Sequence, residues 1–154
     1  MDRLRSMKGF RSVLMLLVAA LAIFMVSCSG QPVAKGPLYT TDQLTQIETS
    51  LATVQDLRER MLEIPSLVQK GDWNDVQTYI HGPLGELRFK MSSLARQLRP
   101  EKAQKEALEA ARDVFEHLNT IDEATVSNDR IKALKNYNEA LRDFDTFLNL
   151  IPTA

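Results

Sequence analysis

The chain has 154 residues, with 19 Lys plus Arg against 20 Asp plus Glu, and it contains two histidines and one cysteine. A length of this order fits one domain. The single cysteine excludes an internal disulfide, and the sequence has no run of basic residues interleaved with aromatic ones, which argues against nucleic-acid binding.

Residues 1–27 have the composition of a bacterial lipoprotein signal peptide. Four basic residues precede an uncharged run over residues 13–26, which is shorter than the roughly 20 apolar residues that span a membrane. Cys28 follows directly. Acylation of its thiol and cleavage before it would give a lipid-anchored protein, since two or three acyl chains hold stably at about 0.8 kcal/mol per buried methylene. An ordinary secretory signal and an uncleaved anchor are the alternatives.

Residues 28–40 are predicted to form a flexible, lipidated tether, because Gly and Pro are frequent there and no apolar period is present. From Cys28 onward, 15 Lys plus Arg stand against 19 Asp plus Glu, a net charge of −4. A mildly acidic exported domain again argues against nucleic acid as a partner.

The first predicted helix begins near Thr41. Thr41 or Asp42 is expected to cap it, and Pro65 is expected to end or kink it, because proline donates no hydrogen bond into the helix. Apolar residues recur there at spacings of three and four, which is typical of one buried helix face. These residues are Leu44, Ile47, Leu51, Val54, Leu57, Met61 and Ile64.

The second predicted helix begins near Trp73, after a possible cap at Asp72, and its apolar period continues to Leu98. Gly82-Pro83 interrupts this period, so a kink or short break is expected there. The third helix is predicted from about Glu101 to Ala124. Pro100 suits the first helical position, because the amide hydrogen that proline lacks would have no partner in that turn.

The fourth predicted helix follows a break at residues 127–129 and stops before Pro152. Its expected core face consists of Ile131, Leu134, Tyr137, Leu141, Phe144, Leu148 and Ile151. Four such helices with short connections predict an all-α, antiparallel up-down-up-down four-helix bundle over residues 41–154. Coiled-coil oligomerisation is the alternative, but the interruptions favour folding back within one chain.

Residues for catalysis or cofactor binding are sparse. The sequence has no Ser-His-Asp grouping, no phosphate-binding glycine loop, no Glu-x-x-His pair for a di-metal bundle and no Cys-x-x-Cys-His for haem. We therefore predict no enzymatic activity, no cofactor, no catalytic or metal site and no small-molecule substrate.

Both histidines have two possible interpretations. Asp113 and His117 lie four residues apart and could share a zinc ion with a third ligand, or they could form a solvated charged pair on the outer face of their helix. His81 could ligate haem, or it could be a partly buried, hydrogen-bonded residue at the kink.

Trp73 and Tyr79 could contribute to a partner-binding face, since aromatic residues dominate binding hot spots. Trp73 is in phase with the buried stripe, which favours a core position. Tyr79 is out of phase, so its ring is expected to be exposed.

Two stretches, residues 71–98 and residues 137–148, resemble the PsbQ family of photosystem II. The first reads Gly71-Asp-Trp-Asn-Asp-Val-Gln-Thr-Tyr-Ile-His-Gly-Pro-Leu-Gly-Glu-Leu-Arg-Phe-Lys-Met-Ser-Ser-Leu-Ala-Arg-Gln-Leu98, and the second runs from Tyr137 to Leu148. The lipoprotein signal resembles that of its cyanobacterial branch. This resemblance implies a non-catalytic, extrinsic subunit on the lumenal side of the thylakoid membrane, which stabilises the oxygen-evolving complex and helps to retain calcium and chloride. Its partners would be the photosystem II core, the other extrinsic subunits and, through Cys28, membrane lipid. A generic periplasmic lipoprotein adaptor and a metal- or haem-binding bundle are the alternatives.

Overall fold

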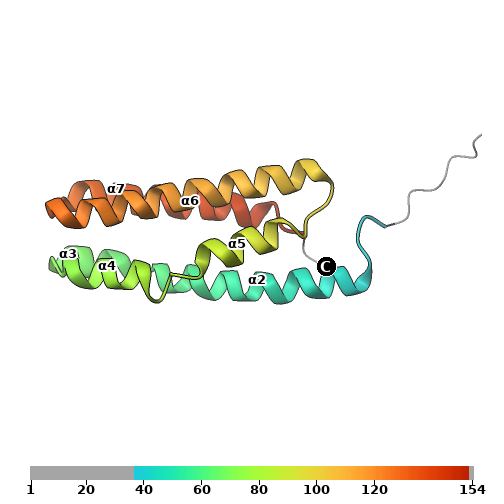
Figure 1. Ribbon diagram of the computed structural model, residues 1–154, viewed down its shortest axis with the longest axis horizontal. Helices are drawn as coiled ribbons and strands as arrows, with labels where there is room; N and C mark the ends of the chain where they lie inside the picture. Colours follow the sequence, from blue (N-terminus) through green and yellow to red (C-terminus); the bar gives the residue numbers. More distant parts are fainter. Residues whose placement is uncertain (1–36, 153–154) are drawn as a thin grey trace, which may run out of the picture. The chain divides into compact units, whose positions relative to one another are not determined.

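A computed structural model describes residues 37–152, which form six α-helices and no strand within that range (Figure 1). Residues 1–36 lie outside the described part, and with them the predicted signal peptide, Cys28 and most of the predicted tether. The helices are α2 (Thr41–Met61), α3 (Ile64–Lys70), α4 (Trp73–His81), α5 (Leu87–Ala95), α6 (Glu101–Ser127) and α7 (Arg130–Asn149).

The helices make four antiparallel passes along one bundle, which confirms the predicted all-α fold (Figure 1). The α2–α3 and α4–α5 pairs form the first two passes, and α6 and α7 form the other two. The start of α2, the α5–α6 connection and the C-terminal end of α7 lie at one end of the bundle. The α3–α4 and α6–α7 connections lie at the opposite end.

The first pass begins at Thr41, as expected, but its cap lies one residue earlier than predicted, and the pass breaks before Pro65. Thr40, rather than Thr41 or Asp42, caps α2: its hydroxyl accepts from the Gln43 amide, and the Gln43 side chain accepts from the Thr40 amide. Helix α2 ends at Met61, and Pro65 lies in the first turn of α3, where its missing N–H removes no helical hydrogen bond. The proline therefore starts a new helix instead of ending the first one.

The second pass is interrupted at the predicted Gly82-Pro83 position. Residues 82–86 separate α4 from α5, while Leu84 between them remains buried and keeps the core face continuous. Gly85 is required by space: a Cβ built there would lie 2.4 Å from the carbonyl oxygen of His81. The interruption therefore leaves the core intact and changes only the direction of the backbone.

The last two passes are uninterrupted helices. Helix α6 continues three residues past the predicted end, to Ser127, and Asn128 ends it in the left-handed conformation at φ 54°. The Asp129 side chain then accepts from the Lys132 amide at 2.9 Å and caps α7. Ile131, which was predicted to be in the core, is 84% exposed, because it lies in the first turn of α7 beside the helix connection.

One hydrophobic core joins all six helices and consists of aliphatic, alanine and aromatic side chains. The phenyl rings of Phe144 and Phe147 are fully buried and pack edge to face, with centroids 6.4 Å apart. Tyr137 is also buried, and this burial raises the pKa of its phenol, although the positive charge of Arg58 opposes the effect. Arg58 itself bridges α2 and α7, with its Nη2 atom 2.6 Å from Oδ1 of Asp145.

Candidate functional site

The predicted lipidation residue, Cys28, lies outside the described residues and stays a prediction. Within residues 37–152, no helix is both long and apolar enough to cross a bilayer.

His117 connects α6 to α7. Its Nδ1 lies 2.8 Å from Oδ1 of Asn136, and its Nε2 lies 3.3 Å from Oδ2 of Asp143. The side chain is 29% exposed, so the interpretation of a solvated pair with Asp113 is wrong. The Oδ1 atom of Asp113 lies instead 3.9 Å from the Nη2 atom of Arg112. No cluster of three or more possible metal ligands exists among the described residues, so the zinc interpretation has no third ligand there.

His81 lies at the end of α4 and contacts α6 through Asp122, with Nε2 and Oδ1 3.2 Å apart. The predicted hydrogen bond beside the helix break is therefore present. However, the His81 side chain is 65% exposed, so the expectation of partial burial is wrong. The carboxylate reaches outward to the imidazole, because Asp122 is the more buried partner of the two.

Trp73 and Tyr79 both pack against the core at the α3–α4 end of the bundle. Trp73 is only half-buried, although its position in the apolar stripe predicted a core residue. Tyr79 is half-buried as well, which corrects the expectation of an exposed ring: its hydroxyl donates to the Arg60 carbonyl at 3.0 Å. This hydrogen bond connects α4 to the end of α2 and explains why an out-of-phase tyrosine turns inward.

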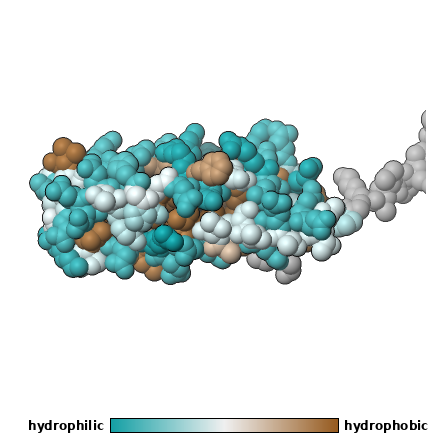
Figure 2. Space-filling model, turned by 60° about the horizontal axis from the view of Figure 1, so that its bottom comes forward, coloured by the Kyte–Doolittle hydropathy of each residue, from teal (hydrophilic) through white to brown (hydrophobic). Residues whose placement is uncertain are grey.

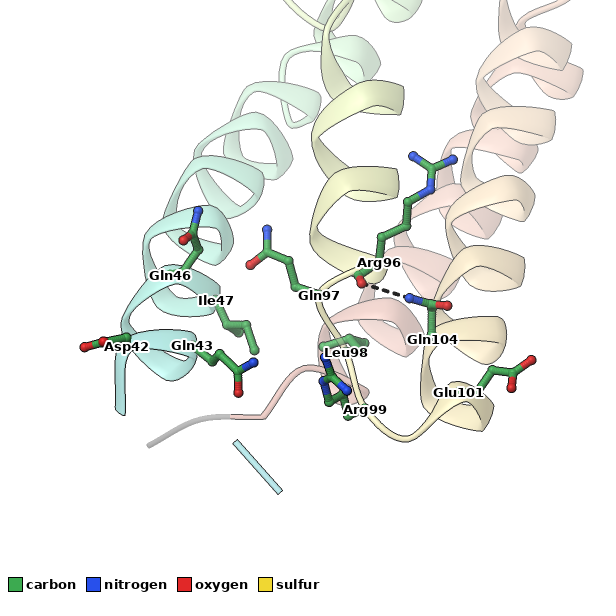
Figure 3. Close-up of a pocket in the computed structure, with 10 residues that line it drawn as sticks. All are labelled: Asp42, Gln43, Gln46, Ile47, Arg96, Gln97, Leu98, Arg99, Glu101 and Gln104. Carbon is green, nitrogen blue, oxygen red and sulfur yellow. Dashed lines mark hydrogen bonds between the residues drawn. The ribbon is translucent and has the colours of Figure 1, made fainter. Parts of the chain in front are cut away.

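A polar hollow of about 480 Å³ lies between the start of α2 and the α5–α6 connection (Figure 3). Gln46 and Gln97 lie on facing sides of it, and the Gln97 Nε2 donates to the Ser50 hydroxyl at 3.1 Å. The Gln97 Oε1 is buried without a hydrogen-bond partner among residues 37–152. Amides and arginines predominate in the lining, and no Ser, Cys or His contributes to it, so the hollow is suited to hydrogen bonding and not to nucleophilic catalysis.

Comparison with known proteins shows the relationships of the chain. Residues 5–152 match the family model PsbQ, oxygen evolving enhancer protein 3. The chain belongs to the PsbQ family. It is also similar to CyanoQ of Synechocystis sp. (strain ATCC 27184 / PCC 6803 / Kazusa), with 39% identity over 151 residues, which cover 96% of this chain and 99% of that protein.

Members of the PsbQ family are non-catalytic, extrinsic subunits of photosystem II, which confirms the prediction of no enzymatic activity. The family resemblance inferred from Gly71–Leu98 is confirmed too. For a PsbQ protein the functional site is an interaction surface, and the residues of interest are exposed ones that folding does not account for.

One such surface was missed by the sequence reasoning. It consists of Arg88, Phe89, Arg96 and Arg99, all exposed, on α5 and the residues that follow it, and is called the α5 surface here. Residues 87–99 contain four Lys or Arg and no Asp or Glu, and this local charge bias was a signal that the sequence offered.

The rest of the surface is unlike a broad hydrophobic interface. Figure 2 shows one face of the molecule, on which hydrophobic residues are scattered in a mainly hydrophilic surface. The large exposed apolar residues are Leu38, Leu62, Phe89, Val126 and Ile131, and only the last two, which flank the α6–α7 connection, are close in sequence. Charge and hydrogen bonding are therefore the properties by which this PsbQ protein can recognise a partner.

Proposed function

We propose that this protein is a lipid-anchored, extrinsic subunit on the lumenal side of the thylakoid membrane, which docks on photosystem II and stabilises its oxygen-evolving complex. The observation that carries the proposal is the 39% identity to CyanoQ over nearly the full length of both chains. Family membership supports photosystem II as the partner, and the sequence around Cys28 supports the anchor.

The physical character of the bundle agrees with a stabilising role. Its core is apolar throughout, apart from Thr125, and its surface is charged and mainly hydrophilic. Such a domain adds a rigid body to an assembly and covers part of it. Covering the lumenal side of the oxygen-evolving complex would slow the escape of calcium and chloride, which is how the protein would help to retain these ions.

Acylation of Cys28 would confine the domain to a thin layer above the membrane. Anchoring in the membrane would raise the effective concentration of the bundle at its docking site on photosystem II, without requiring new contacts between the two. A modest affinity of the bundle for the photosystem would then suffice for occupancy.

The first test is an affinity purification. Membranes from cells that carry a tag after Ala154 are extracted with mild detergent, and mass spectrometry identifies the co-purifying proteins and the mature N-terminus. We expect photosystem II core subunits and an acylated Cys28. Recovery of the acylated protein alone, or with envelope proteins, would contradict the photosynthetic assignment.

The anchor is tested by Cys28→Ser. Cys28 lies before the first described helix, so we expect the variant to fold normally, with an unchanged circular dichroism spectrum, and to be lost from washed membranes. Gln31→Ala, three residues later, is the matched control and should stay on the membrane. Equal retention of both variants would refute lipid anchoring through Cys28.

Ion retention is tested by oxygen evolution. A strain without the protein should lose activity faster than wild type when calcium or chloride is removed from the medium, and restoring the ions should rescue it. An equal rate of loss in both strains would refute the role in retention while leaving docking intact.

A further inference from the structure

The α5 surface differs in charge from the rest of the chain. Residues 87–99 carry Arg88, Lys90, Arg96 and Arg99 and no carboxylate, whereas the chain from Cys28 onward has a net charge of −4. An acidic domain with one locally basic face has a directional field, which orients it toward a partner of opposite charge. The segregation therefore indicates a specific face.

Helical geometry places Phe89 and Arg96 on one face of α5, because they are seven residues, about two turns, apart. Arg88 lies about 100° around the helix from Phe89, on the adjacent side toward Phe115 of α6. Arg99 continues the surface toward the polar hollow, which Arg96 and Arg99 also line. The result is a stripe of guanidinium groups with a phenyl ring beside it.

These guanidinium groups are not used to hold the fold together. Arg88, Arg96 and Arg99 make no ion pair within residues 37–152, whereas Lys102 and Lys105 on α6 pair with Glu106 and Glu101. Arg88 is instead held over the ring of Phe115, with its Cζ atom 4.4 Å from the centroid. Stacking of this kind fixes a guanidinium in place and leaves its N–H groups free to bind an anion.

Phe89 is the second unexplained feature. Its side chain is 69% exposed beside the guanidinium groups, and its contact with water is unfavourable at roughly 25 cal/mol per Å² of apolar surface. Aromatic residues and arginine are the types enriched in protein interfaces, and a buried aromatic inside a polar rim is a common arrangement of a hot spot.

From these features we infer that the α5 surface docks on an acidic protein segment of the lumenal assembly of photosystem II, with carboxylates against the three arginines and an apolar pocket for Phe89. The inference rests on the proposed function. A protein partner fits better than anionic lipid, because lipid-binding clusters contain four to eight cations and no single protruding aromatic is needed among them. The stripe has three unpaired cations and one such aromatic.

The test is rebinding of full-length, tagged protein to photosystem II membranes from a strain that lacks it, measured over a range of NaCl concentrations. The double variant Arg96→Glu/Arg99→Glu is expected to bind at least tenfold more weakly than wild type, and Phe89→Ala at least threefold more weakly. Lys102→Glu/Lys105→Glu is the matched control: it makes the same charge change on exposed residues of α6 and is expected to bind within twofold of wild type. Circular dichroism establishes that each variant is folded.

Each outcome of the rebinding experiment either supports the inference or overturns it. If wild type binds and the Arg96→Glu/Arg99→Glu variant binds equally well, the α5 surface is not the docking site, while the proposed function stands. If this variant and the α6 control lose binding equally, the loss is a general effect of charge and not of the α5 surface. Failure of wild type to bind would overturn the proposed function and the inference with it. Vesicles of anionic phospholipid serve as a separate probe: if the arginine variant loses binding only to vesicles, the surface binds lipid and the inference is wrong.

Discussion

The α6–α7 pair and the α2–α5 half of the bundle have similar lengths of chain and opposite architectures. Helices α6 and α7 are continuous over 27 and 20 residues, and residues 101–151 contain neither glycine nor proline. In the other half, each break contains one of these residues or lies directly before one: Pro65, Gly71, Gly82, Pro83 or Gly85. Helix breaks in the α2–α5 half therefore follow the local backbone chemistry of glycine and proline.

The two halves also use their side chains differently. The α6–α7 pair buries six alanines and two fully enclosed phenyl rings, so the helices approach closely around large anchors. The α2–α5 half buries mainly Leu, Ile, Val and Met, and its short helix α5 presents Phe89 and the arginines to solvent. The comparison therefore shows two kinds of packing: close helix approach around aromatic rings in the continuous pair, and aliphatic packing in the broken half, which also carries the exposed α5 surface.

The largest difference in stability is expected when the same substitution, Phe to Ala, is made once in each half. Phe144→Ala removes a fully buried ring from α7 and should lower the free energy of unfolding by about 3–5 kcal/mol. Phe89→Ala on α5 should change it by less than about 0.5 kcal/mol, because that ring is 69% exposed. Urea denaturation followed by circular dichroism measures both. Similar losses for the two variants would contradict the assignment of Phe89 to recognition.

The fold was predictable from the sequence to the extent that hydrophobic periodicity determines it. The period of three and four residues located all four passes, and glycine and proline located the breaks between them. The type of each break was harder to predict. Pro65 was expected to end or kink the first helix, and an interruption does occur there, but α2 already ends at Met61 and the proline lies in the first turn of α3.

The side-chain environments were less predictable, because they depend on which helices become neighbours. His117 was interpreted through Asp113 on its own helix, but its partners Asn136 and Asp143 come from α7. Tyr79 turns inward only because the Arg60 carbonyl is available at the end of α2. The hollow around Gln97 joins segments about 50 residues apart, and no local pattern marks it.

An intermediate effect is expected at the break between α4 and α5. Gly85→Ala places a methyl group 2.4 Å from the backbone oxygen of His81, which cannot move without changing the turn. We expect a loss of about 1–3 kcal/mol in unfolding free energy, typical of overpacking. Glu86→Ala, at the next residue, removes only an exposed side chain and its 3.5 Å ion pair with Lys90, and is expected to cost less than about 0.5 kcal/mol. A neutral Gly85→Ala would show that this break adjusts freely, against the view that it is locally determined.

The smallest effect on unfolding free energy is expected at two helix starts, that of α7 in the continuous pair and that of α4 in the broken half. Asp129 precedes α7 and accepts from the Lys132 amide at 2.9 Å, whereas Asp72 precedes α4 and makes no side-chain capping bond. Asp129→Ala should therefore cost about 1 kcal/mol of unfolding free energy, and Asp72→Ala less than about 0.5 kcal/mol. The two substitutions remove the same charge, so thermal or urea unfolding at equal ionic strength isolates the hydrogen bond from the helix dipole. Equal losses would mean that the dipole interaction is the common cause, and that the start of the continuous pair has no advantage over that of the broken half.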